Sequence, residues 1–497
     1  MDARMILLVV LSGLAMWGAF PDQGWWPLMF VSLALLTGVV RRASAGWGAA
    51  YGALWAMVFF LPHISWMNIA TNQTYLAWIL LALAQAFFLA LWGLSFAAVS
   101  RWPAAQTWWG EALAAAILWV GFEQIRARVP LGGFPWAKLP YGLVDSPLVH
   151  LAPWGGEVLV SAAAVVVAVW ARRAVTGQWW LAVPALALFG APALVPLETA
   201  PQNGTVNVLA VQGNVAIPME ETYAVAGQVT QNHVDETLRA LDAGADPDLV
   251  IWGEDSVDRD PNTTELTAGL VEQVLERGQV PLVAGYQEYA HDERYNWYSV
   301  WYPGTGQGPD RYGKQHPVPW GEYVPWRSLS EFLATEAAAI RVDMASVDNP
   351  GLLPVTLADG RVVPLAVGIC FEAGDEPIIA EGVRLGGEAI VIPTNNSQFR
   401  ASAESTQQLQ MARFRAAEFS RATLQVSTNG VSAVISPDGQ VVAETDRQTA
   451  AHLSAEIPLR TSLTPAARWE TALTGGAMGL AVLLGIGGLA WGWRRRG

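Results

Sequence analysis

Hydrophobic and polar positions are segregated along the 497-residue chain. Long apolar stretches fill most of residues 1–197, and one more lies at the C-terminal end. The segment between them alternates short β-branched runs, such as VNVLAVQ and DLVIWGE, with polar stretches of helical periodicity. Apolar stretches of this length are typical of membrane spans, and the alternation is typical of a layered α/β domain. The pattern therefore predicts an α/β domain set between membrane segments.

Eight apolar stretches predict eight membrane spans. They lie near residues 5–20, 26–40, 46–66, 76–99, 107–125, 157–171, 178–197 and 472–493. A span needs roughly 20 mostly apolar residues, so the first, second and sixth are short, and we expect their flanks to extend them or the segments to lie shallow. The first stretch could instead be a signal peptide, but it lacks a small-x-small cleavage site and is interpreted as a retained span.

The charges separate the same segments and orient them. Residues 1–197 carry nine basic and six acidic residues and the tail from Thr471 three arginines, which leaves 17 basic and 37 acidic residues in 198–470. If every stretch crosses, one side of the membrane holds Arg4, Arg41, Arg42, Arg101, Arg172, Arg173 and Arg494 to Arg496. The positive-inside rule makes that side cytoplasmic. The acidic domain is thus predicted to be extracytoplasmic.

A few charged residues depart from this scheme. Arg126, Arg128 and Lys138 fall on the opposite side, in the loop between the fifth and sixth stretches. They either hold lipid phosphate or snorkel from a helix end to the surface, and the sequence leaves both readings open. Glu123 is the main charge within a predicted span, and Arg126 is spaced to pair with it.

The acidic segment lacks the signatures of several common sites. Its histidines do not have metal-ligand spacing, so no metal and no cofactor is predicted. The run from Gly304 to Gly308 lacks the Gly-Lys-Ser/Thr end of a phosphate loop, and no helix is expected after it. No Gly-x-Ser-x-Gly elbow supports a serine nucleophile. No nucleic-acid partner is predicted.

The remaining candidate chemistry centres on Cys370, the only cysteine in the chain. It ends the apolar run VVPLAVGIC before a probable helix start, where it is either a small buried hydrophobe or a presented nucleophile. Glu254 ends DLVIWGE, where burial would raise its pKa, and Lys314 lies eight residues before Glu322 in an aromatic-rich run. Glu254 and Lys314 also have the ordinary readings of a solvated strand end and a surface lysine. Together they suit cysteine catalysis, because an ammonium lowers a thiol pKa and stabilises an oxyanion while a carboxylate moves the proton.

Three segments carry a resemblance to a known superfamily. WGED around Glu254, YGKQHPVPWGEYVP around Lys314 and GICFE around Cys370 resemble the catalytic segments of the nitrilase superfamily. With seven spans before the domain and one after it, the chain resembles the apolipoprotein N-acyltransferases, nearer their actinobacterial branch. The resemblance implies that Glu254 is the general base, Lys314 the oxyanion stabiliser and Cys370 the nucleophile. Glu322 and Glu372 match supporting residues.

The resemblance also implies a fold and a reaction. The fold is a seven-span bundle over 1–197, an αββα sandwich domain over 198–470, and a last span with a basic cytoplasmic tail over 471–497. The reaction moves an acyl chain from a membrane phospholipid, through a cysteine thioester, to the α-amino group of a diacylglyceryl-cysteine on a lipoprotein. A monomer in the bacterial cytoplasmic membrane is expected. The alternatives are a membrane-tethered amidase that uses water, and a catalytically silent scaffold that anchors a glycosyltransferase.

Four departures from the family pattern bear on specificity. Gly253 stands where proline is usual, Phe371 where many members have tyrosine, and Gln408 where many have histidine, while TNNSQF replaces a more usual Asn-Asp-x-Trp-Phe. Separately, residues 326–344 carry apolar residues at helical spacing. We interpret this segment either as a surface helix packed on the domain or as a lid that dips into the bilayer surface.

Overall fold

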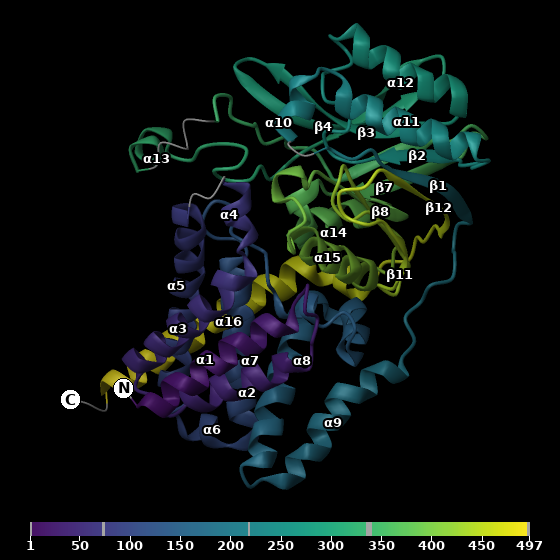
Figure 1. The fold of residues 1–497 in the computed structure, drawn as a ribbon. Helices are drawn as coiled ribbons and strands as arrows, with labels where there is room; N and C mark the ends of the chain where they lie inside the picture. Colours follow the sequence, from purple (N-terminus) through teal and green to yellow (C-terminus); the bar gives the residue numbers. More distant parts are fainter. Residues whose placement is uncertain (1, 72–74, 217–218, 334–339, 495–497) are drawn as a thin grey trace. The chain divides into compact units, whose positions relative to one another are not determined.

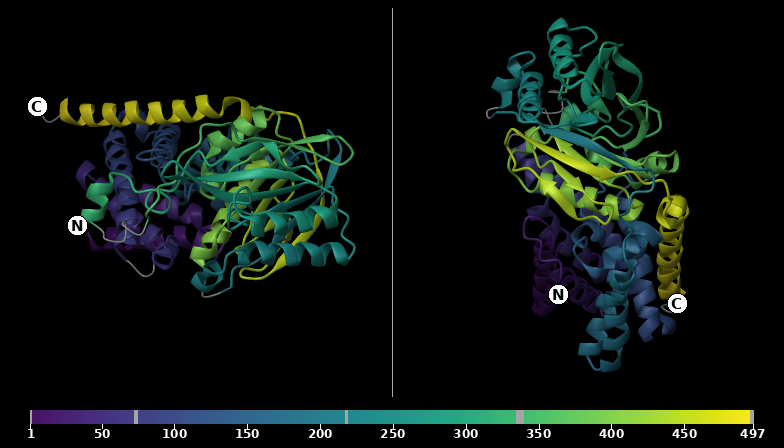
Figure 2. Two further views of the ribbon diagram at one scale, coloured as in Figure 1. Left: turned by 90° about the horizontal axis from the view of Figure 1, so that it is seen from above. Right: turned by 90° about the vertical axis from the view of Figure 1, so that its right-hand side faces the viewer.

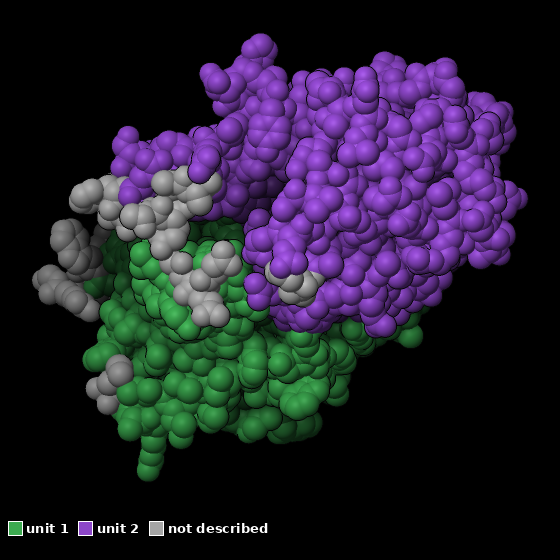
Figure 3. Space-filling model, turned by 45° about the horizontal axis from the view of Figure 1, so that its top comes forward, with its two compact units in different colours: residues 1–197, 469–497 green, residues 198–468 purple. Residues whose placement is uncertain are grey.

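The structure is a computed structural model that describes residues 2–71, 75–216, 219–333 and 340–494. The chain forms two compact units. Unit 1 comprises residues 1–197 and 469–497, and unit 2 comprises residues 198–468 (Figure 3). Each unit is described by itself below.

Unit 1 is helical (Figure 1). Its helices are α1 Ala3–Ala19, α2 Leu28–Val40, α3 Ala45–His63, α4 Trp66–Ala70, α5 Tyr75–Val99, α6 Pro103–Gln106, α7 Trp108–Arg126, α8 Ala152–Val175 and α9 Ala182–Gly190, with most of α16 Pro465–Arg494. Short 3₁₀ turns are η1 Leu139–Gly142, η2 Pro147–Leu151, η3 Trp179–Leu181 and η4 Ala191–Leu194. A helical segment lies over each of the eight predicted stretches.

Length and hydropathy together separate these helices into two groups. Within the described residues, four helical segments are long and apolar enough to cross a membrane: Ala45–His63, Tyr75–Val99, Pro147–Val175 and Pro465–Gly492. The first two predicted stretches remain short as helices, with 17 residues in α1 and 13 in α2. The sixth is extended by its flanks, as expected, and non-helical backbone at Gly155 and Gly156 breaks α8 near its start.

Glycines let α3 and α5 approach each other closely. A Cβ at Gly52 would lie 2.0 Å from the carbonyl oxygen of Leu89, and one at Gly93 would lie 2.1 Å from that of Gly48. Gly48 and Gly52 are four residues apart and therefore lie on one face of α3. This spacing of small residues is the usual means by which membrane helices bring their backbones together.

The loop after α7 buries two of the three basic residues that departed from the charge scheme. Arg126 donates to the carbonyl oxygens of Trp136 at 2.8 Å and Ala137 at 2.9 Å, and Lys138 Nζ lies 2.5 Å from Glu157 Oε2. Both cations are internal to unit 1, so neither lipid binding nor snorkelling describes them. The partial exposure of Arg128 is compatible with either reading.

Glu123, near the C-terminal end of α7, also forms hydrogen bonds within unit 1. Glu123 accepts hydrogen bonds from Leu139 N at 2.9 Å and Ser161 Oγ at 2.5 Å. The charges of Glu123 and Arg126 attract each other, as the suggested pairing expects. The direct hydrogen bonds of the carboxylate tie the following loop to α8.

Unit 2 contains two six-stranded sheets. The first has the order β12-β1-β2-β3-β4-β5, with β1 Thr205–Gln212, β2 Leu249–Trp252, β3 Leu282–Ala290, β4 Glu293–Tyr302, β5 Gly306–Gly313 and β12 Ala451–Pro458. The second has the order β11-β10-β9-β8-β7-β6, with β6 Leu352–Thr356, β7 Val362–Val367, β8 Ala389–Thr394, β9 Thr423–Ser427, β10 Ala433–Ile435 and β11 Val441–Glu444. Each sheet has three parallel strands in its interior. They are β1, β2 and β3 in the first sheet and β7, β8 and β9 in the second.

The two sheets lie face to face between helical layers (Figures 1 and 2). The helices of unit 2 are α10 Met219–Ala224, α11 Gln228–Asp242, α12 Glu265–Gly278, α13 Arg327–Leu333, α14 Glu376–Arg384 and α15 Glu404–Phe419, with the turns η6 Cys370–Gly374 and η7 Ser397–Phe399. Strand β1 shows the cause of the layering: Val206 and Val208 pack between the sheets, whereas Leu209 and Val211 pack under α11 and α12. Alternate residues of a strand face opposite sides. The predicted layered α/β domain is confirmed.

The ends of three strands, β2, β5 and β7, bring the candidate residues to one edge of the sandwich. Strand β2 ends two residues before Glu254, β7 ends three residues before Cys370, and β5 ends directly before Lys314. The candidate lid was predicted over residues 326–344, of which α13 covers only Arg327–Leu333. Its apolar residues Leu329, Phe332 and Leu333 have side chains outside the described set.

Candidate active site

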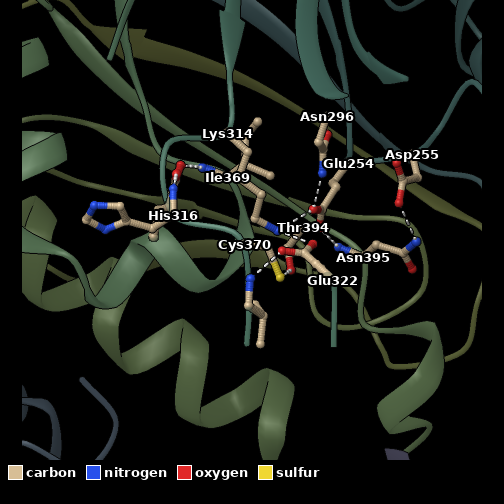
Figure 4. A network of polar contacts seen from close by, with 12 residues as sticks. Glu254, Asp255, Asn296, Lys314, His316, Glu322, Ile369, Cys370, Thr394 and Asn395 are labelled. Carbon is tan, nitrogen blue, oxygen red and sulfur yellow. Dashed lines mark hydrogen bonds and ion pairs between the residues drawn. The ribbon is translucent and has the colours of Figure 1, made fainter. Parts of the chain in front are cut away.

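The chain turns sharply where it presents Cys370. This residue begins η6 with φ of 54°, in the left-handed region that non-glycine residues seldom adopt. Such strain persists only where surrounding contacts enforce it, and it is concentrated at functional sites. The side chain of Cys370 is partly buried and points toward Lys314, Glu254 and Glu322 (Figure 4).

Glu372 holds this turn in place. Its Oε2 accepts hydrogen bonds from Ile369 N at 2.7 Å and Tyr312 Oη at 2.8 Å, and its Oε1 accepts from Gln315 N at 2.7 Å and His316 N at 2.9 Å. The carboxylate therefore bonds both the cysteine turn and the segment that follows Lys314. Burial raises the pKa of Glu372, although the hydrogen bonds oppose that rise. Its position supports a structural role beside Cys370.

Glu254 lies at the centre of the cluster and is almost completely buried. Its Oε1 accepts from Lys314 Nζ at 2.9 Å and Asn296 Nδ2 at 2.7 Å, and its Oε2 accepts from Asn395 N at 2.9 Å. Burial raises the pKa of Glu254 to about 7, while Lys314 acts in the opposite direction. A carboxylate with a pKa close to neutrality is suited to taking and returning a proton.

Lys314 bridges two carboxylates. Its Nζ lies 2.9 Å from Glu254 Oε1 and 2.6 Å from Glu322 Oε1, and Glu322 Oε2 in turn accepts from Val318 N at 2.7 Å. Burial alone would lower the pKa of Lys314, but Glu254 and Glu322 outweigh it and raise that pKa well above its ordinary value. The side chain therefore stays an ammonium ion and a fixed positive charge in the site.

The surroundings of Cys370 favour its neutral thiol. Burial and the charge of Glu254 raise its pKa well above the ordinary value, and Lys314 only partly offsets this. Lys314 acts in the direction expected from the sequence, but burial and Glu254 act against it and are the larger effects. Because the thiol keeps its proton, the site needs a base, and Glu254 is the titratable group best placed for that task.

Several residues that complete the site were not predicted. Asn296 on β4 bonds Glu254 through its side chain, and Asn395 bonds it through its backbone N–H. Thr394, the last residue of β8, has its Oγ1 3.4 Å from Cys370 Sγ. Asn395 and Thr394 lie at the start of TNNSQF, directly after a buried strand. That position at the end of a parallel strand is the signal that could have revealed them.

One departure from the family pattern has a visible structural setting. A Cβ at Gly253 would lie 3.0 Å from Thr428 N and 3.0 Å from the carbonyl oxygen of Val426. The backbone before Glu254 thus runs tightly against β9 and the residue after it, and a larger residue would require the neighbours to move. Among the described residues, no group of three or more His, Cys, Asp or Glu side chains is arranged to hold a metal ion.

The fold and the site define the class of protein. A cysteine presented at the end of a parallel strand, beside a buried Glu–Lys pair in an αββα sandwich, agrees with the match of residues 231–463 to the carbon-nitrogen hydrolase family. Residues 12–170 match the apolipoprotein N-acyltransferase N-terminal domain. The chain joins both regions, so it combines a hydrolase-type domain with a membrane bundle.

Full-length relatives make the family specific. The apolipoprotein N-acyltransferase of Mycolicibacterium smegmatis is 35% identical and the match covers 92% of this chain and 80% of the relative. That of Azotobacter vinelandii is 32% identical, over 99% of this chain and 95% of the relative. The chain belongs to the apolipoprotein N-acyltransferase family. Among solved structures, an amidase of the nitrilase superfamily from Nesterenkonia matches 54% of this chain and 95% of its own, with 13% identity and a TM-score of 0.40.

Proposed function

We propose that this protein transfers an acyl chain from a membrane phospholipid to the α-amino group of a diacylglyceryl-cysteine at a lipoprotein N-terminus. Family membership over nearly the whole chain supports the reaction. The observation that carries the assignment of residues is the buried contact of Glu254 with Lys314, at 2.9 Å, beside the strained turn of Cys370. No metal or cofactor is needed for the steps below.

In the first step Cys370 Sγ attacks the ester carbonyl carbon of the phospholipid. The thiol proton passes to Glu254, a carbon–sulfur bond forms, and negative charge develops on the carbonyl oxygen. The ammonium of Lys314 stabilises that charge. As the carbon–oxygen bond breaks, Glu254 returns the proton to the departing alkoxide, which leaves as a lysophospholipid. The products are an acyl thioester on Cys370 and a regenerated Glu254 carboxylate.

In the second step the lipoprotein amine attacks the thioester. A carbon–nitrogen bond forms and the carbon–sulfur bond breaks. Glu254 takes a proton from the nitrogen and returns it to the sulfur of Cys370. The first product leaves before the second substrate enters, so the kinetics are ping-pong. Water competes with the amine, and a site that receives lipid substrates favours the amine by excluding water.

The two supporting glutamates have separate tasks in this scheme. Glu322 is the second carboxylate that fixes Lys314, since it bonds Lys314 Nζ at 2.6 Å. Glu372 ties the turn of Cys370, which it bonds at Ile369 N, to Tyr312 and to the segment after Lys314, with four hydrogen bonds in all. Neither carboxylate is required to exchange a proton with substrate.

The topology that goes with this function has eight spans and an extracytoplasmic catalytic domain. The arginine distribution supports it, because it places the basic tail on the cytoplasmic side. In this scheme residues 1–197 form seven spans, 198–470 the domain and 471–497 the last span, in a monomer of the bacterial cytoplasmic membrane. Protease added to intact spheroplasts should cut the domain and spare a C-terminal tag. Cleavage of the tag would overturn the orientation.

Mass spectrometry of the purified full-length chain tests the reaction. Incubation with phospholipid should add an acyl group to Cys370, and a diacylglyceryl lipopeptide should then discharge it as an N-acylated product. The Cys370→Ser variant should fold and insert but form neither product. Release of free fatty acid with no lipopeptide product would favour the water-using amidase. An unmodified Cys370 would favour the silent scaffold, and either result would overturn the proposal.

A further inference from the structure

A chain of polar side chains beneath Cys370 has its hydrogen-bond direction set by the backbone. It begins at Ser427, whose Oγ accepts from Gly430 N at 2.7 Å and Asn429 N at 3.3 Å. With those donors pointing at the oxygen, the hydroxyl proton of Ser427 is directed to Asn396 Oδ1, 2.7 Å away. Backbone N–H groups can only donate. The direction of the first side-chain bond is therefore fixed.

This first bond determines the orientation of two side-chain amides. Because Asn396 Oδ1 is the acceptor for Ser427, Asn396 Nδ2 is the donor to Gln408 Oε1 at 3.0 Å and to Glu404 Oε2 at 2.8 Å. The Gln408 oxygen must then face Asn396, since two NH₂ groups facing each other would make no bond. Gln408 Oε1 is thus an acceptor, and it is fully buried.

Thr394 connects this chain to the reacting sulfur. Its Oγ1 lies 3.0 Å from Gln408 Oε1 and 3.4 Å from Cys370 Sγ. A hydroxyl has one proton and two lone pairs, so it cannot donate to both neighbours at once. With a neutral thiol, Thr394 donates to Gln408 and accepts the S–H of Cys370. With a thiolate, the same hydroxyl can rotate and donate to sulfur.

We propose that Thr394 is a further catalytic residue, whose hydroxyl turns from Gln408 to Cys370 whenever the sulfur carries negative charge. The proposal rests on the proposed role of Cys370 as nucleophile. Rotation costs little because Gln408 Oε1 keeps its bond from Asn396. Charge is on sulfur when Cys370 attacks the ester and again when the thioester is cleaved. One hydroxyl therefore serves both half-reactions, and only a hydrogen bond changes partner.

Two substitutions should act in opposite directions. Thr394→Val keeps the shape of the side chain and removes the hydrogen-bond donor. The pH profile of Cys370 alkylation by iodoacetamide should therefore move to higher pH. Acyl-enzyme formation should slow about 10- to 100-fold, as expected for a lost hydrogen bond to a charged group. Thr394→Ser should restore both to near wild type. Gln408→Met removes the competing acceptor, so the Thr394 hydroxyl can donate to the sulfur of Cys370 at all times. The pH profile of alkylation should then move to lower pH.

Thr423→Val is the matched control, because Thr423 is a buried threonine on the neighbouring strand β9 whose Oγ1 bonds the carbonyl oxygen of Arg421 at 3.2 Å. It should leave both alkylation and acylation unchanged. The idea is overturned if Thr394→Val alkylates and acylates like wild type, if Thr394→Ser is as impaired as Thr394→Val, or if Gln408→Met shifts the profile upward. Wild-type protein that alkylates but never acylates would overturn the proposed function instead, while the alkylation profiles would still report on Thr394.

Discussion

Lys314 Nζ and Glu254 Oε1 meet at 2.9 Å although the two residues are 60 positions apart, and both side chains are at most 4% exposed. The contact gives the two groups different protonation behaviour. Lys314 has a second carboxylate beside it and keeps its charge, whereas Glu254 is buried deeply enough that its pKa rises to about 7. One member of the pair is a fixed charge and the other a titrating base.

The first prediction concerns the pH dependence of acylation. Glu254 acts as a base only when it has lost its proton, so the rate of acyl-enzyme formation should increase as the pH rises through about 7. Glu254→Gln removes the base and should slow this step about 10²- to 10⁴-fold and abolish the dependence. Single-turnover mass spectrometry of Cys370 across this range measures both. A wild-type profile that is flat through neutrality would contradict the assignment.

Glu322 should behave differently from Glu254 in the same assay. Glu322→Gln keeps a side-chain oxygen that can accept from Lys314, and Glu254 still balances the ammonium charge. The first step should therefore be slowed but detectable, and it should keep a pH dependence set by Glu254. That dependence should move to lower pH, because the charge of Glu322 helps to raise the pKa of Glu254. Equal loss of acyl-enzyme in both variants would show that the two carboxylates have been given distinct roles wrongly.

The sequence was sufficient to predict the layered domain, and it supplied the three candidate catalytic residues that the structure brings close together. The β-branched runs predicted strands β1, β2, β7 and β8, and the motif residues Glu254, Lys314 and Cys370 each lie within three residues of the end of a strand. Glu254 and Lys314 follow strands of one sheet, whereas Cys370 follows a strand of the other. Short-range patterns therefore placed each residue at a strand end, and the packing of the two sheets brings them into one site. The direct contact of Lys314 with Glu254 is a finding of the structure that the sequence did not predict.

What the sequence could not supply was the balance of opposing effects. The pKa of Cys370 depends on burial and on Glu254 more than on Lys314, and burial comes from tertiary packing. The roles of Thr394 and Gln408 depend on hydrogen bonds between strand β8 and helix α15. The loop after α7 was misread for a similar reason, because Lys138 is neutralised by Glu157, which lies on the following helix.

Glu372 supports a prediction about positioning. A carboxylate can accept from all four of its donors, but in Glu372→Gln the NH₂ group cannot accept, so up to two buried donors lose their partner. Each such loss costs about 1–3 kcal/mol. The variant should melt at a lower temperature and acylate more slowly, while Tyr312→Phe, which removes only one hydroxyl from Glu372 Oε2, should have a smaller effect on both. A Glu372→Gln variant with wild-type melting and acylation would exclude this positioning role.

The last prediction concerns Glu404, whose carboxyl group is 1% exposed and accepts from Asn396 Nδ2 at 2.8 Å. Burial raises the pKa of Glu404 from 4.5 to about 8, so the folded protein holds this proton more tightly than the unfolded chain does. The resulting stability is complete below about 4.5 and is lost as the pH rises through about 8.

Glu404→Gln copies the protonated form and still offers an oxygen to Asn396, so it should remove this part of the pH dependence. Its melting temperature should equal that of wild type near pH 4.5 and exceed it increasingly up to about pH 8. Glu265→Gln, a change at an exposed position in α12, controls for the loss of one negative charge and should show no such divergence. Thermal unfolding of the full-length variants in the same detergent provides the comparison. If the melting temperatures of wild type and Glu404→Gln changed with pH in parallel, Glu404 would already be ionised in the folded protein. Contacts stronger than the hydrogen bond from Asn396 would then compensate its burial.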